Sequence, residues 1–255
     1  MTRRLTTALA PLAFAAGLAA APALAFDIEF MTPDERSAFR EEIRAYLLDN
    51  PEVLMEAIAV LERRDAAAQV ANDQTLVATN REALFDDGYS HIGGNPEGDI
   101  TFVEFFDYKC GYCKKAHPEV QALLAADGNI RIIYKEFPIL GEESLLASRF
   151  AIATQIVAGE EAYGRLHDAL YEMRGNVTEE SLTGLATELG LDAEAILAGM
   201  TDPRIDEIIA ENHALAQRMQ ISGTPTFVMG DQMLRGYVPL SAMEQIVEEL
   251  REQQG

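Results

Sequence analysis

Two cysteines are the residues of this sequence best suited to covalent chemistry. The 255-residue chain contains only Cys110 and Cys113, which are separated by Gly111 and Tyr112. The pair lies where a predicted strand passes into a predicted helix, and the free amide groups of a helix start favour a thiolate. We therefore expect Cys110 to act as the nucleophile and the more buried Cys113 to act as the resolving thiol.

A bond between these two sulfurs would close a very short loop and would add little stability through chain entropy. This suggests a disulfide that is made and broken during function. Half of a zinc site has the same spacing, but zinc takes four ligands and only His117 lies close by, on the same predicted helix. We therefore expect no metal ion, and no cofactor other than the redox-active Cys110–Cys113 disulfide.

A second signal lies far downstream, where Pro225 opens a strand-like segment after Gly223 and Thr224. If the Thr224–Pro225 bond is cis, the turn would bring Thr224 beside the cysteines and leave backbone groups able to pair with an extended substrate. An ordinary turn is the alternative for this triplet taken alone. We assign substrate binding to Thr224, Pro225 and Tyr112, and we expect Tyr108 and Tyr112 to shape the rim around the sulfur.

Glu104 lies in the middle of an apolar segment that reads as a buried strand. A carboxylate in that position costs several kcal/mol unless it is paired or protonated, so a functional role is one explanation. An ion pair with Lys135 on the neighbouring predicted strand is the other.

The elements that must position these residues follow from the hydrophobic pattern. A strand over 100–107, a helix over 110–126 and a strand over 130–137 form a βαβ unit. Five helical segments follow, and a strand pair and a last helix end the chain. These later segments are predicted over 143–157, 160–173, 179–189, 192–198, 203–220, 226–229, 232–235 and 240–252. We expect an α/β domain over 90–255 with a helical insertion at about 140–220.

The N-terminus reads as a signal peptide over residues 1–25. Arg3 and Arg4 precede an uncharged stretch that ends in the small-residue pattern Ala23-Leu24-Ala25. A membrane anchor is the competing interpretation, but Pro11 and Pro22 interrupt the stretch. The mature protein is expected outside the cytoplasm, where disulfides persist.

Residues 26–89 are predicted to form a helical arm. Thr32 and Glu35 have the spacing of a capping box, and a second helix is expected to start after Pro51. The second helix carries a narrow apolar face of Val53, Leu54, Ala57, Ile58 and Leu61. Such a face needs a partner surface. We expect a homo-oligomer formed through this arm, with packing on the chain's own catalytic domain as the alternative.

Composition limits the remaining function classes. The chain is 48% hydrophobic, which is enough for a real core and excludes a disordered protein. Its 20 basic and 42 acidic residues give a formal charge of −22. A surface this negative repels phosphate backbones and anionic lipids, so nucleic acid is excluded as a partner.

The order of these features resembles the thioredoxin superfamily, and specifically the DsbA-like periplasmic proteins with a helical insertion. The match runs from about residue 99 to residue 250. The segment from Phe105 to Lys115, FFDYKCGYCKK, together with the arm, looks like the suppressor-of-copper-sensitivity protein C (ScsC) type. The resemblance implies a thioredoxin fold, a periplasmic location and a cis-proline at Pro225. It also implies that Glu104 takes the proton of the resolving thiol.

The resemblance also implies a function, namely thiol-disulfide exchange on protein substrates that contain cysteines. It implies a membrane thiol electron donor or acceptor as partner. Thr224 and the Gly-Tyr dipeptide look more like isomerases than like the strong oxidases, which have valine and Pro-His at these positions. We therefore expect a protein disulfide isomerase or reductase. A DsbA-like dithiol oxidase is the first alternative, and a periplasmic protein that binds Cu(I) through its two sulfurs is the second.

Overall fold

The computed structural model describes residues 30–254, so the signal peptide predicted for residues 1–25 lies outside the described residues. The chain divides into two compact units, one ending at Leu61 and the other beginning at Glu62. None of the helices in residues 30–254 combines the length and the apolar character that crossing a bilayer requires.

The first unit contains the helix α1 (Pro33–Asp49) and the beginning of α2 (Glu52–Thr79). The predicted capping box is confirmed, because Thr32 Oγ1 accepts a hydrogen bond from the Glu35 amide at 3.3 Å and Glu35 Oε2 accepts one from the Thr32 amide at 2.9 Å. No residue of α1 is buried.

The second unit includes the end of α2 and the short helix α3 (Arg81–Phe85). Val77 and Leu84 are buried in the same apolar cluster as the sheet residues Val103 and Phe105. The boundary between compact units therefore lies well before residue 89, where the sequence placed the end of the arm, because the second half of α2 contributes to the core of the larger unit.

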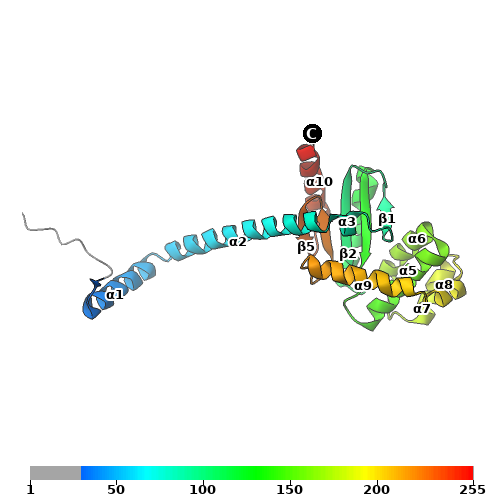
Figure 1. Ribbon diagram of the computed structural model, residues 1–255, viewed down its shortest axis with the longest axis horizontal. Coiled ribbons are helices and arrows are strands. Elements are labelled where there is room, and N and C mark those ends of the chain that lie inside the picture. The colour runs from blue at the N-terminus through cyan, green and yellow to red at the C-terminus, as the bar shows by residue number, and fades with distance from the viewer. Residues whose placement is uncertain (1–29, 255) are drawn as a thin grey trace, which may run out of the picture. The chain divides into compact units, whose positions relative to one another are not determined.

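The sheet has five strands in the order β1-β3-β2-β4-β5. Figure 1 labels β1, β2 and β5 of this sheet. The strands β2 and β3 run parallel, and the other neighbours pair antiparallel. Their bounds are β1 His91–Gly94, β2 Ile100–Phe106, β3 Ile130–Glu136, β4 Thr226–Met229 and β5 Gln232–Arg235. The edge strand β1 was not predicted, since two of its four residues are glycines, which are depleted in strands.

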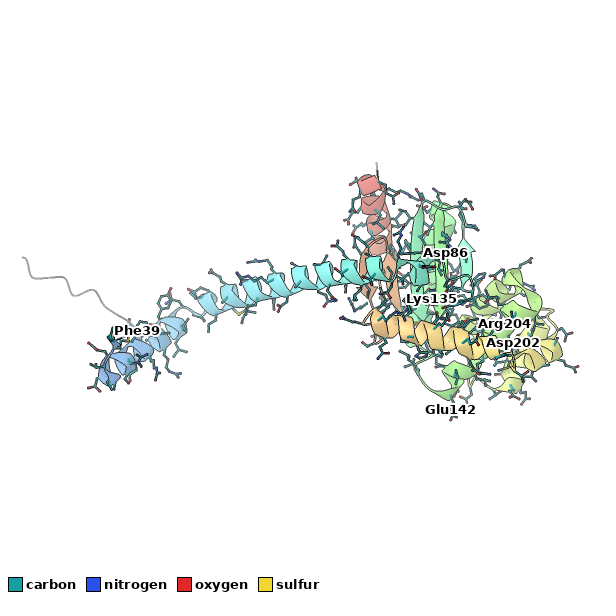
Figure 2. The ribbon with its side chains drawn as sticks, viewed as in Figure 1. Phe39, Asp86, Lys135, Glu142, Asp202 and Arg204 are labelled. Atoms are coloured by element: carbon teal, nitrogen blue, oxygen red, sulfur yellow. The ribbon has the colours of Figure 1, made fainter. Side chains whose placement is uncertain are left out.

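The remaining helices confirm the predicted segments to within a few residues. Their bounds are α4 Gly111–Asp127, α5 Glu142–Ala158, α6 Glu160–Glu172, α7 Glu179–Glu188, α8 Ala193–Gly199, α9 Pro203–Arg218 and α10 Leu240–Gln254. At the start of α9, Asp202 accepts the amide hydrogen of Arg204 at 2.9 Å and pairs with its guanidinium at 2.7 Å (Figure 2). These local hydrogen bonds explain why the helix begins after Asp202.

The two faces of the sheet carry different cores. Phe102 and Phe106 of β2 pack in one cluster with α4, α10 and the helical insertion α5–α8. Val103 and Phe105 face the other way, into the cluster that contains Val77 and the α9 residue Leu215. This alternation decides which polar side chains of β2 and β3 can meet.

Candidate active site

Cys110 is the N-cap residue of α4, in the loop that leaves the end of β2. Asp107 holds this loop: its backbone carbonyl accepts a hydrogen bond from the Cys110 amide at 3.0 Å. Its Oδ2 atom accepts bonds from the Ile139 and Leu140 amides at 2.8 and 3.0 Å. The sequence analysis did not single out Asp107, although an aspartate after a strand is a common turn signal.

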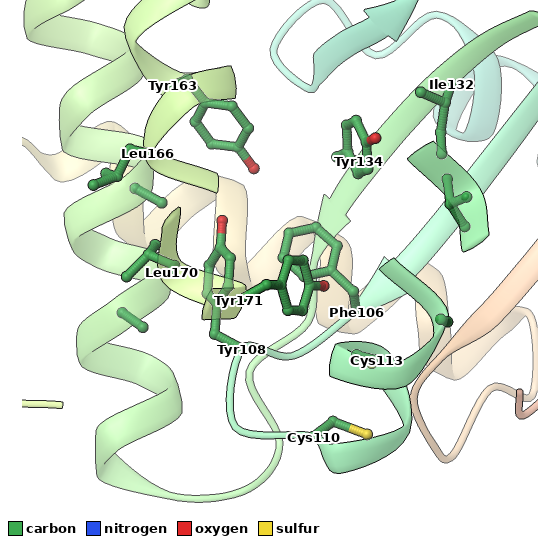
Figure 3. Packing of buried hydrophobic residues seen from close by; sticks show 14 of the residues in the cluster. Phe106, Tyr108, Cys110, Cys113, Ile132, Tyr134, Tyr163, Leu166, Leu170 and Tyr171 are labelled. Carbon is green, nitrogen blue, oxygen red and sulfur yellow. The ribbon is translucent and has the colours of Figure 1, made fainter. Parts of the chain in front are cut away.

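The two cysteines differ in burial. Both thiols are free, Cys110 is 7% exposed and Cys113 is fully buried. Figure 3 shows the Cys110 sulfur at the tip of α4 and Cys113 further along the helix. Burial, and after it the negative charge of Glu104, raises the pKa of the Cys113 thiol. Cys110 is thus the less buried of the two sulfurs, and burial favours the neutral form of the Cys113 thiol.

The structure brings the Thr224–Pro225 segment to the cysteines. The Thr224–Pro225 peptide bond is cis, and the Cys110 thiol donates a hydrogen bond to the Thr224 carbonyl at 3.2 Å. The turn is closed by Thr226 Oγ1, which donates to the Gly223 carbonyl at 2.9 Å. The expected proximity is therefore present, and the substrate-binding roles of Thr224 and Pro225 stay predictions.

Glu104 is a buried carboxyl group, and within residues 30–254 it has no ion-pair partner. Its side chain lies on β2 with 1% of the residue exposed, and its Oε1 atom has no hydrogen-bond partner among the residues that the structure describes. Burial raises the pKa of Glu104 to about 8. A group with this pKa can take up or release a proton near neutral pH.

The alternative ion pair between Glu104 and Lys135 is wrong. In the parallel register Glu104 lies opposite Tyr134, while Lys135 lies opposite Phe105 and therefore faces the other side of the sheet. The Lys135 ammonium instead forms an ion pair with Asp87 and donates to the Ala83 carbonyl at 2.8 Å.

The two tyrosines near the motif lie in different surroundings. Tyr112, which precedes Cys113 in the sequence, is 65% exposed, and its substrate contact stays a prediction. Tyr108 is buried, so it does not shape a rim. Its hydroxyl lies 3.0 Å from Glu136 Oε1 and 3.0 Å from His167 Nδ1, in the cluster of aromatic rings between β3 and α6 (Figure 3).

Glu136 is a second buried carboxyl group, which was not predicted as a site residue. Its two oxygens accept hydrogen bonds from the hydroxyls of Tyr108, Tyr163 and Ser148 at 3.0, 2.7 and 2.6 Å. Burial raises the pKa of Glu136 to about 7. A glutamate at the end of an apolar strand was the only available sequence signal.

Taken together, the arrangement provides a thiol that is 7% exposed at a helix start, a fully buried second thiol one turn later and a buried carboxyl group on the adjacent strand. These groups suit attack on a disulfide, followed by proton removal from the second thiol.

Two protein-family models match separate segments of the chain. Residues 101–248 match the DSBA-like thioredoxin domain. Residues 35–68 match the N-terminal domain of the copper resistance protein ScsC.

Two curated relatives match more than half of the chain. A Na(+)/H(+) antiporter NhaA 1 of Salinispora arenicola is 31% identical over 162 residues, which are 64% of this chain and 25% of the antiporter. The chain thus spans about a quarter of that relative's length. Disulfide bond formation protein D of Bacillus subtilis is 25% identical over 61% of this chain and 74% of its own.

Solved structures confirm the predicted thioredoxin fold with its helical insertion and N-terminal helical segment. A thioredoxin-like oxidoreductase from Silicibacter pomeroyi is 43% identical and covers 68% of this chain and 98% of its own, with a TM-score of 0.64. A linker-deletion mutant of Proteus mirabilis ScsC is 25% identical over 88% of this chain and 98% of its own, with a TM-score of 0.66. Because the DsbA-like model matches more than half of the sequence, the chain belongs to the DsbA-like thioredoxin family of thiol-disulfide oxidoreductases.

Proposed function

We propose that this protein is a protein disulfide isomerase or reductase, with Cys110 as nucleophile and Cys113 as resolving thiol. The observation that carries the proposal is the 3.2 Å hydrogen bond from the Cys110 thiol to the Thr224 carbonyl. It places the more exposed sulfur beside a backbone segment along which an extended client peptide could lie. The roles of Thr224, Pro225 and Tyr112 in holding that client belong to the same proposal.

In the proposed reaction, the Cys110 thiolate attacks one sulfur of a client disulfide. A mixed disulfide forms and the client's other sulfur leaves as a thiolate. In isomerisation, another client thiolate attacks the mixed disulfide and releases Cys110, with no net transfer of electrons. In reduction, Cys113 loses its proton and attacks Cys110, which releases the client with two more electrons and leaves the Cys110–Cys113 disulfide. A thiol electron donor must then reduce that disulfide again.

The direction of the reaction is the finer part of the proposal. Thr224 and the Gly111-Tyr112 dipeptide resemble the isomerases, and this favours isomerisation over net oxidation. A dithiol oxidase would use the same steps in reverse, so only the relative stability of the two redox states separates the two functions.

Equilibration with glutathione buffers, together with reactivation of scrambled ribonuclease, tests the direction. A reducing potential and restored ribonuclease activity are expected. A protein that oxidises reduced clients and leaves scrambled ribonuclease inactive would instead be the oxidase.

A separate experiment tests which sulfur is the nucleophile and which is the resolving thiol. In Cys113→Ser protein the mixed disulfide has no internal thiol to resolve it, so a Cys110-linked client should accumulate and be visible on a non-reducing gel. Cys110→Ser protein is the matched control and should trap nothing. Trapping by Cys110→Ser protein and not by Cys113→Ser protein would reverse the assignment.

Self-association through the arm is a further part of the proposed function. In the described chain the apolar face predicted on α2 remains open: Leu54 is 47% exposed, Ile58 is 47% exposed and Leu61 is 56% exposed. A second copy of the arm would bury this face. Several catalytic domains in one assembly would let a client be held at more than one point.

The proposed compartment is the periplasm. The predicted signal peptide and the likeness to ScsC support it, and a membrane thiol protein is the proposed source of electrons. Fractionation of cells that produce the full-length chain checks this location, and processing near residue 25 is expected.

A further inference from the structure

A cluster of potential metal ligands lies away from the two sulfurs. His117 is on the catalytic helix α4, and His167 and Asp168 are adjacent on α6. One ligand atom from each of these three residues lies within 4.8 Å of the others. We propose that His117, His167 and Asp168 bind a divalent transition-metal ion of the zinc class. This departs from the expectation of no metal that the sequence alone supported.

The hydrogen bonds of His167 leave one of its nitrogens free. His167 is 1% exposed, and its Nδ1 atom lies 3.0 Å from the Tyr108 hydroxyl. Its Nε2 atom has no hydrogen-bond partner in the described part of the chain. An imidazole nitrogen buried without a partner costs free energy, so it needs an explanation. A bound ion would supply the missing partner.

The neighbours of Tyr108 determine which nitrogen of His167 carries the proton. Glu136 accepts hydrogen bonds from three hydroxyl groups, including that of Tyr108 at 3.0 Å, as an ionised carboxylate does. The Tyr108 hydroxyl then donates its single hydrogen to Glu136, so the Tyr108 oxygen accepts the hydrogen of His167 Nδ1. The lone pair of His167 is therefore on Nε2. Metal-binding histidines commonly have their second nitrogen held by a hydrogen bond in this way.

The ligand set and its spacing fit zinc. His117 Nε2 and Asp168 Oδ1 lie 3.2 Å apart. Two ligands on a tetrahedral ion with bonds of about 2.0–2.1 Å are separated by roughly 3.3 Å. Two imidazoles and a carboxylate leave a fourth position for water, as in zinc sites with three protein ligands.

The surroundings allow an ion to enter. The Asp168 side chain is 55% exposed, whereas that of His117 is 11% exposed. A cavity of about 140 Å³, lined by His167, Asp168, His91 and Gln121 among others, adjoins the cluster. This volume holds several waters.

An ion at this position would connect α4 to α6. His117 lies one turn after Cys113, and the Tyr171 ring of α6 stacks on the His117 ring at 4.4 Å between centroids. The ion would therefore fasten the helical insertion to the helix that carries the redox pair. Thiol exchange at Cys110 does not depend on the ion, so the failure of this inference would leave the proposed function intact.

The test is a titration of the Cys110→Ser/Cys113→Ser protein with Zn²⁺ by calorimetry, since this variant lacks sulfur ligands. One ion per chain and a rise in melting temperature are expected. Co²⁺ should give the visible absorption bands of a four-coordinate site without a sulfur charge-transfer band. The same titration of the oxidised wild-type chain, in which the two sulfurs are bonded to each other, repeats the measurement without any substitution.

Matched variants separate this site from unspecific binding by the acidic surface. Asp168→Asn and His117→Gln should each weaken Zn²⁺ binding by at least about tenfold. Two control variants should leave Zn²⁺ binding unchanged. Glu161→Gln makes the same charge change on the exposed side of α6, and His213→Gln removes a histidine outside the cluster. Asp168 is exposed, so its variant is expected to fold even if His117→Gln does not. No stoichiometric binding, or equal affinity of Asp168→Asn and Glu161→Gln, would overturn the proposal.

Discussion

Cys113 and Glu104 share one buried region, in which burial and then the negative charge of Glu104 raise the pKa of the Cys113 thiol. Burial also raises the pKa of Glu104 itself, to about 8. The Cys113 thiol is therefore neutral at rest, and the carboxyl group of Glu104 titrates near neutral pH. This relationship motivates the first two predictions.

Glu104→Gln should slow the step in which Cys113 attacks the mixed disulfide by about a hundredfold or more, because the amide cannot accept the thiol proton. In the wild-type chain this rate should rise with pH up to about 8, as Glu104 ionises, and then level off. Stopped-flow measurement of client release from a preformed Cys110 mixed disulfide checks both effects.

The control for this prediction is Glu142→Gln, which changes an exposed carboxylate at the start of α5 (Figure 2). Its client release should match that of the wild type at every pH. If Glu104→Gln behaves in the same way as this control, Glu104 has no part in proton transfer.

The contribution of Glu104 to the stability of the reduced protein should fall as the pH rises from about 5 to about 8. In that range Glu104 is ionised in the unfolded chain, where its pKa is near 4.5, and is still protonated in the folded chain, where it is about 8. The folded state then binds more protons, so the free energy of unfolding decreases with pH. For a fully buried group the decrease is on the order of a few kcal/mol. Urea unfolding at several pH values measures it.

Glu104→Gln should reduce this pH dependence, since the amide does not ionise. The part that remains is expected from Glu136, whose pKa burial raises to about 7, and with the opposite sign from His167, whose pKa burial lowers. Identical pH dependence of the wild-type and Glu104→Gln proteins would contradict the assigned environment of Glu104.

The hydrogen bonds between Asp73 and Arg235 should contribute measurably to the stability of the larger unit. The Arg235 guanidinium donates to both carboxylate oxygens of Asp73, at 2.7 and 2.8 Å, and so fastens α2 to β5. Arg235→Gln should lower the free energy of unfolding by about 1 kcal/mol, because the Asp73 carboxylate is largely shielded from solvent but the arginine is partly exposed. Thermal and urea unfolding check this value.

Arg204→Gln is the matched control, since Arg204 pairs with Asp202 only two residues away at an exposed helix start. This variant should unfold like the wild type. Equal loss of stability in the two variants would mean that the hydrogen bonds between Asp73 and Arg235 contribute no more to the free energy of unfolding than an exposed ion pair does.

The exposed face of α2 should control self-association. The double variant Leu54→Glu/Ile58→Glu places charge on that face, so it should convert an oligomer to a monomer and lower isomerase activity while simple thiol transfer persists. Ala66→Glu, an exposed position of α2 outside the face, should remain oligomeric. Light scattering measures the mass in solution, and a monomeric wild-type chain would remove the proposal.

Deletion of the N-terminal part of the arm is a second test of self-association, and the last residue removed decides whether the larger unit stays intact. Removal of residues 26–61 leaves the larger unit whole, because that unit begins at Glu62. A longer deletion through residue 86 would also remove Val77 and Leu84 from the core, and its loss of activity would reflect misfolding. The shorter deletion should yield a folded monomer that retains thiol transfer.

The sequence by itself determined the helices and strands with strong local patterns. The capping box at Thr32, the apolar run of β2 and the turn between β4 and β5 each depend on neighbours within a few residues. It also identified Cys110 and Cys113, because their spacing on a helix start has a direct chemical meaning. The resemblance to DsbA-like proteins then assigned a cis bond before Pro225, which the structure has.

Only the tertiary structure decided which distant side chains meet. Glu104 and Lys135 looked like partners in the sequence, but the register of β2 on β3 puts them on opposite faces of the sheet. The approach of His117 to Asp168 likewise depends on how the insertion packs against α4. Local patterns record the backbone preferences of neighbouring residues, whereas strand register and helix packing are set by the burial of many side chains together, and no short stretch of sequence contains that information.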